Sequence, residues 1–301
     1  MPHATILEAG SLATDIKKEV AAQVARLRQA GVEPKMAVVA VAATPASLSY
    51  LESQRRVADK LGIALEITDL GNNADQGRLE AELRRLSADS AVHGVMIQLP
   101  LPQGLDTEAA LDCIDPSKDV DGLTAANCGL VASNHENEAI PAATPQACIM
   151  LAESYVPLAG KQVAVVGRGR TVGRPLVSML LNRHATVTVC HSRTTNLAAV
   201  LKSCEVVMVA VGKPGVVSAA ELAAGQVVID AGISVMDGKV VGDVDPAAVE
   251  TVAAISPVPG GVGTLTSAII FRNLLRAIEL QSGLTASCPR ATDSGKPGEP
   301  N

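Results

Sequence analysis

Apolar residues in the first hundred positions switch repeatedly between helical and strand-like spacing. Ile16, Val20, Val24 and Leu27 lie on one face of a helix predicted over residues 11–27. The same pattern predicts strands over 36–42, 64–70 and 92–99, and helices over 47–61 and 77–88. Strands that alternate with helices in this way form parallel sheets joined by right-handed crossovers.

A second alternation begins near Gly160. It predicts strands over 161–166, 185–190, 206–211 and 227–231, a helix over 173–182 and a final helix over 265–280. Residues 112–137 are rich in Asp, Asn and Gly and are predicted to be irregular, and the polar tail 286–301 is predicted to be disordered. The pattern therefore predicts an α/β protein with two units.

Composition narrows the class of protein. With 301 residues, 48% hydrophobic and 19% charged, the chain can bury a large core. Its net charge of −6 argues against nucleic acid or an anionic membrane as a partner. No apolar run is long enough to span a bilayer and no signal peptide is visible, which predicts a cytoplasmic protein. The six cysteines lack metal-ligand spacing, so we expect no metal site.

A glycine-rich loop stands where a predicted strand passes into a predicted helix. Gly167, Gly169 and Gly173 space this loop, with Thr171 and Val172 between the last two. Glycines let the backbone turn sharply and approach a pyrophosphate, and the helix that follows presents free N–H groups. The spacing is one residue longer than the usual dinucleotide motif, so a tight turn without a ligand is the alternative interpretation.

The end of the next strand indicates which dinucleotide would bind. In NAD-binding folds an acidic residue there takes the ribose hydroxyls, but this strand is followed by His191, Ser192 and Arg193. Ser192 and Arg193, together with Arg168 of the loop, favour a ribose phosphate and hence NADP. The alternative is that Arg193 is only a solvated surface charge.

Five motifs resemble one enzyme family. They are 92–102 (VHGVMIQLPLP), 118–122 (KDVDG), the glycine loop 167–175, the segment 185–194 and 256–263 (SPVPGGVG). Taken together, they resemble the bifunctional methylenetetrahydrofolate dehydrogenase/methenyltetrahydrofolate cyclohydrolase family over roughly residues 12–279. The resemblance implies an α/β catalytic domain that binds folate, formed by 1–140 and 265–285, and a Rossmann-type NADP-binding domain with a parallel sheet, formed by 141–264. Folate would lie in the cleft between them, and the protein would be a homodimer.

The resemblance also assigns roles to individual residues. Tyr50, Gln98 and Asp121 are similar to family residues that pack on folate, hydrogen-bond near the reacting carbon and hold the pterin ring. Further substrate contacts are expected from Ile97, Leu99, Pro259, Gly260, Gly261, Val262 and Gly263. Dinucleotide contacts are expected from Gly167, Arg168, Gly169, Thr171, Val172, Gly173, Ser192, Arg193, Ile233 and Thr266.

The chain departs from the family pattern at one chemically important position. The family has Tyr-x-x-x-Lys, whereas Tyr50 is followed by Gln54 at the lysine position. Residues four apart share a helix face, so Gln54 is expected in the catalytic site, while Arg55 and Arg56 are rotated away. Gly169 also replaces a family serine that could hydrogen-bond a phosphate, which weakens the argument for NADP.

These residues predict oxidation of 5,10-methylenetetrahydrofolate to its methenyl form with NADP. Hydride transfer mainly needs two rings held face to face, whereas hydrolysis of the methenyl product needs a group that moves protons. Since a glutamine does not titrate, cyclohydrolase activity is expected to be weak or lost. Two alternatives stay open: a repurposed enzyme that passes the methylene unit to another nucleophile, and a non-catalytic protein that binds folate or NADP.

Overall fold

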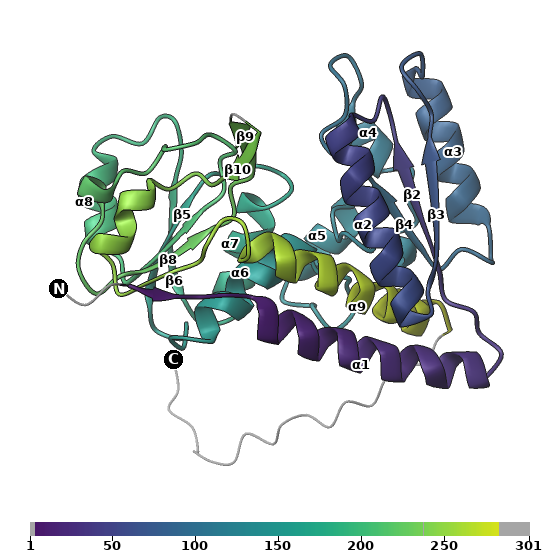
Figure 1. Ribbon diagram of the computed structural model, residues 1–301, viewed down its shortest axis with the longest axis horizontal. Coiled ribbons are helices and arrows are strands. Elements are labelled where there is room, and N and C mark those ends of the chain that lie inside the picture. The colour runs from purple at the N-terminus through teal and green to yellow at the C-terminus, as the bar shows by residue number, and fades with distance from the viewer. Residues whose placement is uncertain (1–3, 237, 283–301) are drawn as a thin grey trace.

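The computed structural model describes residues 4–236 and 238–282, and the tail predicted over 286–301 lies outside the described residues. Two α/β units lie side by side and are joined by long helices that run beneath both (Figure 1). The family resemblance and the alternating pattern both predict this arrangement, and the two-unit parallel architecture is confirmed.

The first unit is built on a three-stranded parallel sheet in the order β3-β2-β4. Its strands are β2 (Lys35–Ala40), β3 (Ala64–Asp69) and β4 (Gly94–Ile97), and its helices are α2 (Pro45–Leu61), α3 (Gln76–Ala88) and α4 (Thr107–Leu111). The central strand β2 is buried from Met36 to Ala40, because helices cover both faces of a parallel sheet.

The second unit is a six-stranded parallel sheet in the order β1-β11-β8-β7-β5-β6. Its strands are β1 (Thr5–Ile6), β5 (Gln162–Val166), β6 (Thr186–Cys190), β7 (Val206–Val209), β8 (Val227–Asp230) and β11 (Ala254–Ile255). Its helices are α7 (Gly173–Leu181) and α8 (Leu197–Lys202), and β9 (Ser234–Met236) pairs with β10 (Lys239–Val241) in a separate antiparallel hairpin. The strand order reverses between β5 and β7, and ligands of open parallel sheets bind at such reversals.

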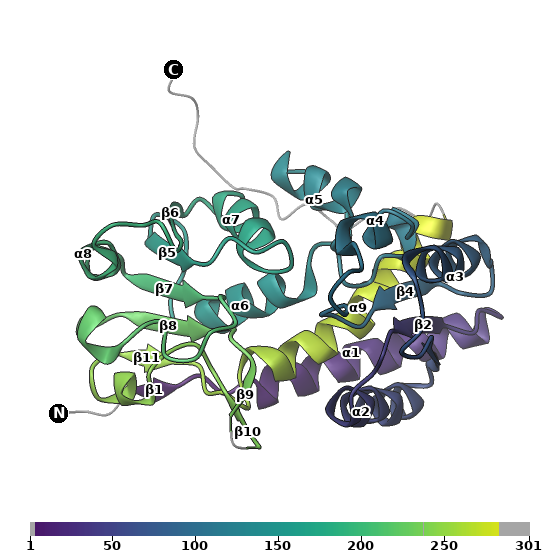
Figure 2. The ribbon, with the colours of Figure 1, turned by 90° about the horizontal axis from the view of Figure 1, so that it is seen from above.

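Three helices connect the units. Helices α1 (Gly10–Gln29), α6 (Ala143–Glu153) and α9 (Val262–Ser282) lie between the two sheets when the molecule is seen from above (Figure 2). One continuous apolar cluster includes Val38 of the first sheet, Val163 of the second and Phe271 of α9. The two units therefore share a core rather than meeting across a solvated boundary.

A buried amide fixes α9 against the chain that joins the units. Asn273 is 3% exposed, and its Nδ2 donates to the carbonyls of Val120 (2.8 Å) and Pro141 (3.0 Å). Its Oδ1 accepts from Gln146 of α6 at 3.1 Å. Every polar atom of this side chain is thus paired inside the protein.

The structure corrects one expectation about local structure. Residues 112–137 are not irregular throughout, because they contain η1 (Pro116–Lys118) and α5 (Ala125–Ala132), whose first turn is capped by Thr124. Strand β1 pairs with β11, so Thr5 and Ile6 lie in the second sheet. The division into 1–140 with 265–285 and 141–264 stays a prediction.

The remaining short elements are η2 (Ala219–Glu221) and η3 (Pro246–Glu250). Among the described helices, none is both long enough and apolar enough to cross a bilayer.

Candidate active site

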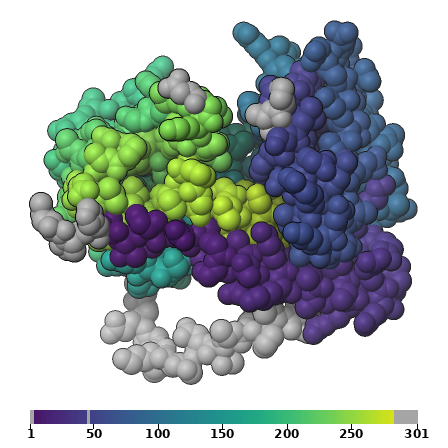
Figure 3. Space-filling model, in the orientation of Figure 1, coloured from purple at the N-terminus to yellow at the C-terminus, as the bar shows by residue number. Residues whose placement is uncertain are grey.

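A cleft opens between the two units, with the β9–β10 side on one wall and α2 on the other (Figure 3). The three-stranded and six-stranded sheets are both parallel, so the loops after β2 and β4, and those after β5 and β7, leave from the carboxyl edge of their sheet, where ligands of such sheets bind. The predicted site residues come from α2, from the loops after β4 and η1, and from the first turns of α9.

Helix α2 places Tyr50 and Gln54 together. The side chain of Thr44 caps its start by accepting from the Ser47 N–H at 3.2 Å, and Gly62 ends it with a φ of 76°. Because Tyr50 and Gln54 are one turn apart, Gln54 Nε2 donates to the Tyr50 hydroxyl at 2.9 Å. Gln54 is only 3% exposed, whereas Tyr50 is 42% exposed, so the buried Gln54 side chain holds the hydroxyl of the more exposed Tyr50.

The far side of the Tyr50 hydroxyl meets α9. Its oxygen lies 3.3 Å from Ser267 Oγ, a residue that the sequence analysis does not single out. Loss of solvation raises the pKa of Tyr50, and the negative charge of Asp121 adds to this rise. Tyr50 and Asp121 therefore belong to one electrostatic neighbourhood.

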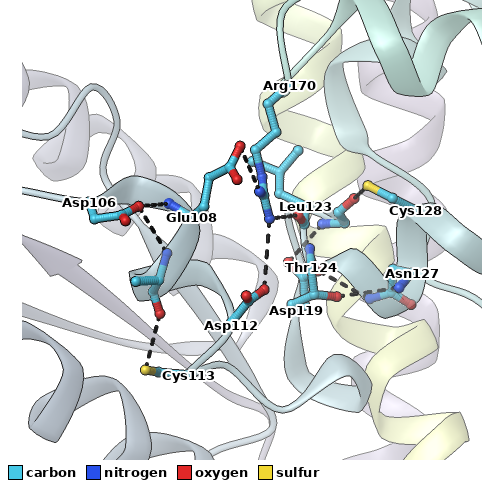
Figure 4. A network of polar contacts seen from close by, with 12 residues as sticks. Asp106, Glu108, Asp112, Cys113, Asp119, Leu123, Thr124, Asn127, Cys128 and Arg170 are labelled. Atoms are coloured by element: carbon cyan, nitrogen blue, oxygen red, sulfur yellow. Dashed lines mark hydrogen bonds and ion pairs between the residues drawn. The ribbon is translucent and has the colours of Figure 1, made fainter.

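Asp121 sits on a turn organised by a second aspartate. The Asp119 side chain is 1% exposed and accepts from the Gly122 N–H (2.9 Å), the Thr124 N–H (2.7 Å) and Asn127 Nδ2 (3.1 Å). Figure 4 shows Asp119 turned inward toward Thr124 and Asn127. Burial, with a further contribution from the charge of Asp119, raises the pKa of Asp121 to about 7.

Gln98 is oriented differently from the other predicted residues. Its backbone N–H donates to Val39 at 2.8 Å, and its side-chain amide donates to the Leu99 carbonyl at 3.1 Å. Ile97 beside it is 3% exposed and supports the sheet. Within the described residues the structure joins Tyr50 to Gln54 by a hydrogen bond and brings Asp121 near, but Gln98 forms no hydrogen bond to any of them.

The predicted loop 259–263 passes directly into α9. Gly260 has a φ of 107° and its carbonyl accepts from the Ala9 N–H at 3.0 Å. A Cβ on Gly261 would lie 2.5 Å from the Pro257 carbonyl oxygen, so this position is closely packed. Val262 begins α9, and the Gly263 carbonyl accepts from Ser267 Oγ at 3.1 Å.

Across the cleft, the glycine loop leaves β5 and enters α7. Gly167 has a φ of 114°, and a Cβ there would lie 2.1 Å from the Ala210 carbonyl oxygen. A Cβ on Gly173 would lie 2.3 Å from the Gly167 carbonyl oxygen, whereas a Cβ on Gly169 would have no atom within 4 Å. Gly167 and Gly173 thus define the tight turn, and Gly169 faces open space that a phosphate group could occupy.

Polar residues predicted to contact the dinucleotide surround this loop. Arg168, Thr171, Ser192 and Arg193 are all exposed. Ile233 is 62% exposed, beside the β9–β10 hairpin. By contrast, Thr266 turns its hydroxyl to the Val262 carbonyl at 3.0 Å and to Thr144 at 3.5 Å, so it is engaged with the connecting helices.

Arg170 joins the glycine loop to the first unit. Its guanidinium donates to the Leu123 carbonyl at 3.3 Å and lies 3.2 Å from Glu108 and 3.9 Å from Asp112 (Figure 4). Leu123 is two residues beyond Asp121, so the glycine loop is tied to the turn that carries Asp121. The sequence analysis does not predict this role, because the carbonyl and the two acids come from a separate segment of the chain.

Two buried carboxylates stabilise the loops next to the glycine turn. Asp243, which is fully buried, accepts from the N–H groups of Val211 (2.6 Å) and Gly212 (2.8 Å). Asp230 accepts from Gly232, Asp243 and Val244, and burial raises its pKa although these hydrogen bonds oppose the rise. Within residues 4–236 and 238–282, no group of three or more His, Cys, Asp or Glu side chains is arranged to hold a metal.

Comparison with known families decides the identity of the two units. Residues 7–121 match the catalytic domain of tetrahydrofolate dehydrogenase/cyclohydrolase, and residues 142–282 match its NAD(P)-binding domain. The chain belongs to this family.

Individual relatives cover nearly the whole chain. The bifunctional protein FolD of Heliobacterium modesticaldum is 46% identical over 284 residues, which are 93% of this chain and 98% of that protein. The crystal structure of the bifunctional FolD enzyme of Campylobacter jejuni superposes with a TM-score of 0.87 at 34% identity, covering 93% of this chain and 100% of that one. The Trypanosoma brucei family member, solved with NADP cofactor and inhibitor, gives 0.86 at 35% identity, covering 94% and 99%.

The geometry of the glycine loop leads to a paired prediction. Gly173→Ala should displace the turn, because its Cβ would overlap the Gly167 carbonyl, and should weaken NADP binding about tenfold or more. Gly169→Ala, whose Cβ meets no protein atom, should leave the turn in place and weaken NADP binding less than Gly173→Ala does. Calorimetric titration with NADP checks both variants, and equal losses in the two would contradict the assignment of the turn.

The raised pKa of Asp121 leads to a prediction about stability. Since its pKa is higher in the folded state, at about 7, than in the unfolded chain, this carboxyl stabilises the fold least above pH 7. At pH 8 the free energy of unfolding, measured with urea, should therefore be higher for Asp121→Asn than for the parent by up to about 4 kcal/mol. This difference should shrink as the pH falls from 7 to 4. The control Asp119→Asn should destabilise the protein at pH 8, because the two Asp119 oxygens accept three hydrogen bonds and an amide would replace one of these oxygens with a donor. A pH-independent effect of Asp121→Asn would refute the assigned pKa.

Proposed function

We propose that this protein oxidises 5,10-methylenetetrahydrofolate to 5,10-methenyltetrahydrofolate with NADP and has weak or no cyclohydrolase activity. The observation that carries the proposal is the pairing of Tyr50 with Gln54, beside Asp121 and across the cleft from a glycine loop. Membership in the dehydrogenase/cyclohydrolase family supports the substrate, and the bifunctional names of the relatives supply both candidate reactions.

The residues around the glycine loop fit a phosphorylated dinucleotide. Gly169 leaves space for a phosphate, and Arg168, Ser192 and Arg193 offer two positive charges and a hydroxyl on the exposed edge of the sheet. The solved Trypanosoma brucei relative contains NADP, which supports NADP rather than NAD here. When bound, the nicotinamide supplies the hydride acceptor.

The chain itself contributes position and electrostatics to the oxidation. Asp121 is a carboxyl group at the base of the cleft that can accept from the ring N–H and amino groups of a pterin once it is ionised. Tyr50 presents its ring to the cleft, where it can pack on the folate. Hydride transfer leaves a cation on the former methylene carbon that the adjacent nitrogens stabilise, so orientation matters more than proton transfer.

Hydrolysis of the methenyl product makes a demand that Gln54 does not meet. Adding water to the methenyl carbon releases protons, and an amide neither gains nor loses a proton at accessible pH. Neighbouring cations do not replace a lysine: Lys118 Nζ donates to the Asp89 carbonyl at 2.7 Å, and Arg55 lies 3.6 Å from Glu52. Gln54 therefore selects oxidation without efficient ring opening.

The test follows NADPH and methenyltetrahydrofolate separately by absorbance after the protein is mixed with 5,10-methylenetetrahydrofolate and NADP. Both should rise together, and methenyltetrahydrofolate should persist. Gln54→Lys should hydrolyse methenyltetrahydrofolate roughly 10²-fold or more faster than the parent, the range expected for general acid–base catalysis.

Gln54→Met is the matched control, because it has a similar length but no proton to transfer. It should leave hydrolysis at the parent level. If the parent hydrolyses methenyltetrahydrofolate as fast as Gln54→Lys does, the proposed loss of cyclohydrolase activity is wrong. If folate binds but no NADPH forms, the oxidation itself is wrong and a transfer or binding role takes its place.

We also propose that the protein is a homodimer through the edge of its second sheet. Among the described strands, β6 pairs only with β5, and its residues Thr188 and Val189 are exposed, the latter by 37%. An unpaired edge strand can add to the same strand of a second copy. Val189→Lys should lower the mass measured by light scattering from dimer to monomer, whereas Val235→Lys on the β9–β10 hairpin should not. A monomeric parent would contradict the proposal.

A further inference from the structure

Four polar groups, two from α2 and two from the first turns of α9, form a hydrogen-bonded row. Gln54 Nε2 contacts the Tyr50 hydroxyl at 2.9 Å, this hydroxyl contacts Ser267 Oγ at 3.3 Å, and Ser267 Oγ contacts the Gly263 carbonyl at 3.1 Å. The row connects α2 to the loop 259–263. Among the described residues, Tyr50–Ser267 is the one hydrogen bond that joins α2 to α9.

The direction of every hydrogen bond in the row follows from its last member. A carbonyl can only accept, so Ser267 donates its single hydroxyl proton to Gly263. Toward Tyr50, Ser267 can then only accept, and Tyr50 must donate. Tyr50 in turn must accept from Gln54, which requires the amide nitrogen of Gln54 on that side, as the structure has it.

The orientation of Gln54 agrees with this direction. Its Oε1 is buried without a hydrogen-bond partner, which leaves one unsatisfied acceptor. The reversed amide would bury an NH₂ group at that position and leave two donors unsatisfied instead. The hydrogen-bond directions deduced from the Gly263 carbonyl therefore agree with the orientation of the Gln54 amide.

We propose that Ser267 is a positioning residue of the folate site. It accepts a hydrogen bond from the Tyr50 hydroxyl and so holds the Tyr50 ring against the substrate. Its place in the helix suits this role, because bonding to the carbonyl four residues earlier fixes the Ser267 rotamer and leaves its lone pairs facing Tyr50. Since its proton is committed to Ser267, Tyr50 contributes its ring and an acceptor lone pair to the cleft rather than a proton. The effect on substrate rests on the proposed folate function, whereas the effect on Tyr50 does not.

The composition of the chain makes the proposal directly measurable. There is no Trp, and Tyr155 is the only tyrosine besides Tyr50. In a Tyr155→Phe background, near-ultraviolet absorbance reports ionisation of Tyr50 alone, and tyrosine fluorescence reports ligands that reach it. Tyr155 lies beyond the end of α6 and is 45% exposed, so this background should fold normally.

In this background Ser267→Ala should lower the midpoint of Tyr50 ionisation by about 0.4 to 1 pH unit, because the lost hydrogen bond is one that Tyr50 donates and that stabilises the protonated phenol. Ser267→Thr keeps the hydroxyl and should have the parent midpoint. Thr14→Ala removes another helical hydroxyl that bonds four residues back, in α1, and should cause no shift. An unchanged or raised midpoint in Ser267→Ala, or equal shifts in the Ala and Thr variants, would overturn the proposal.

A kinetic measurement separates positioning from general structural support. Ser267→Ala should raise KM for 5,10-methylenetetrahydrofolate about 3- to 10-fold, with kcat and KM for NADP within about twofold of the parent. If the parent protein turns nothing over, the dehydrogenase proposal fails, and 5,10-methylenetetrahydrofolate quenching of Tyr50 fluorescence is compared instead. Weaker quenching in Ser267→Ala but not in Ser267→Thr then supports the role of Ser267, and equal affinities overturn it.

Discussion

Burial of α9 against both sheets is the constraint on which the active site depends. Phe271 and Leu274 lie within an apolar cluster that also contains strand residues of both units, so α9 cannot shift relative to one sheet without losing contact with the other. Residues from its first turns therefore keep a fixed position in the cleft. Asn273 reinforces this by pairing with the chain that links the two units.

This arrangement explains how separate segments make one site. Tyr50 belongs to helix α2 of the first unit, and Gly263 and Ser267 belong to the first turns of the shared helix α9. A hydrogen-bonded row across two such segments is useful only if their spacing is fixed, because a hydrogen bond weakens within a few tenths of an ångström. The shared core provides that spacing, and Arg170 adds a direct connection between the glycine loop and the turn that carries Asp121.

Much of the fold could be predicted from the sequence, for physical reasons that also explain the errors. Buried parallel strands such as β2 are continuous apolar runs, and amphipathic helices such as α1 show their period clearly. Helix α5 was missed because it is only eight residues long and lies in a segment rich in turn-forming residues, so its packing decides its structure. The family resemblance singles out Tyr50 and Gln54, and helical spacing predicts that they share a face. The same spacing connects Gly263 with Ser267. Contacts between distant segments, such as Tyr50 with Ser267 and Arg170 with Leu123, leave no periodic trace in a single sequence.

The raised pKa of Asp121 is what a neutral side chain at position 54 would leave, because no positive charge there favours the carboxylate. Burial and Asp119 both disfavour charge on Asp121, and the contributions that set its pKa include no compensating cation. The nearest lysine of the motif, Lys118, is 6% exposed and directs its ammonium to the Asp89 carbonyl. A lysine at position 54 would place a positive charge beside Tyr50 and favour the Asp121 anion before any ligand arrives. With Gln54 there, no cation among the described contributions offsets the burial that raises the pKa of Asp121. Under the proposed function, the two N–H groups of a bound pterin would supply the interaction that favours the ionised carboxyl group.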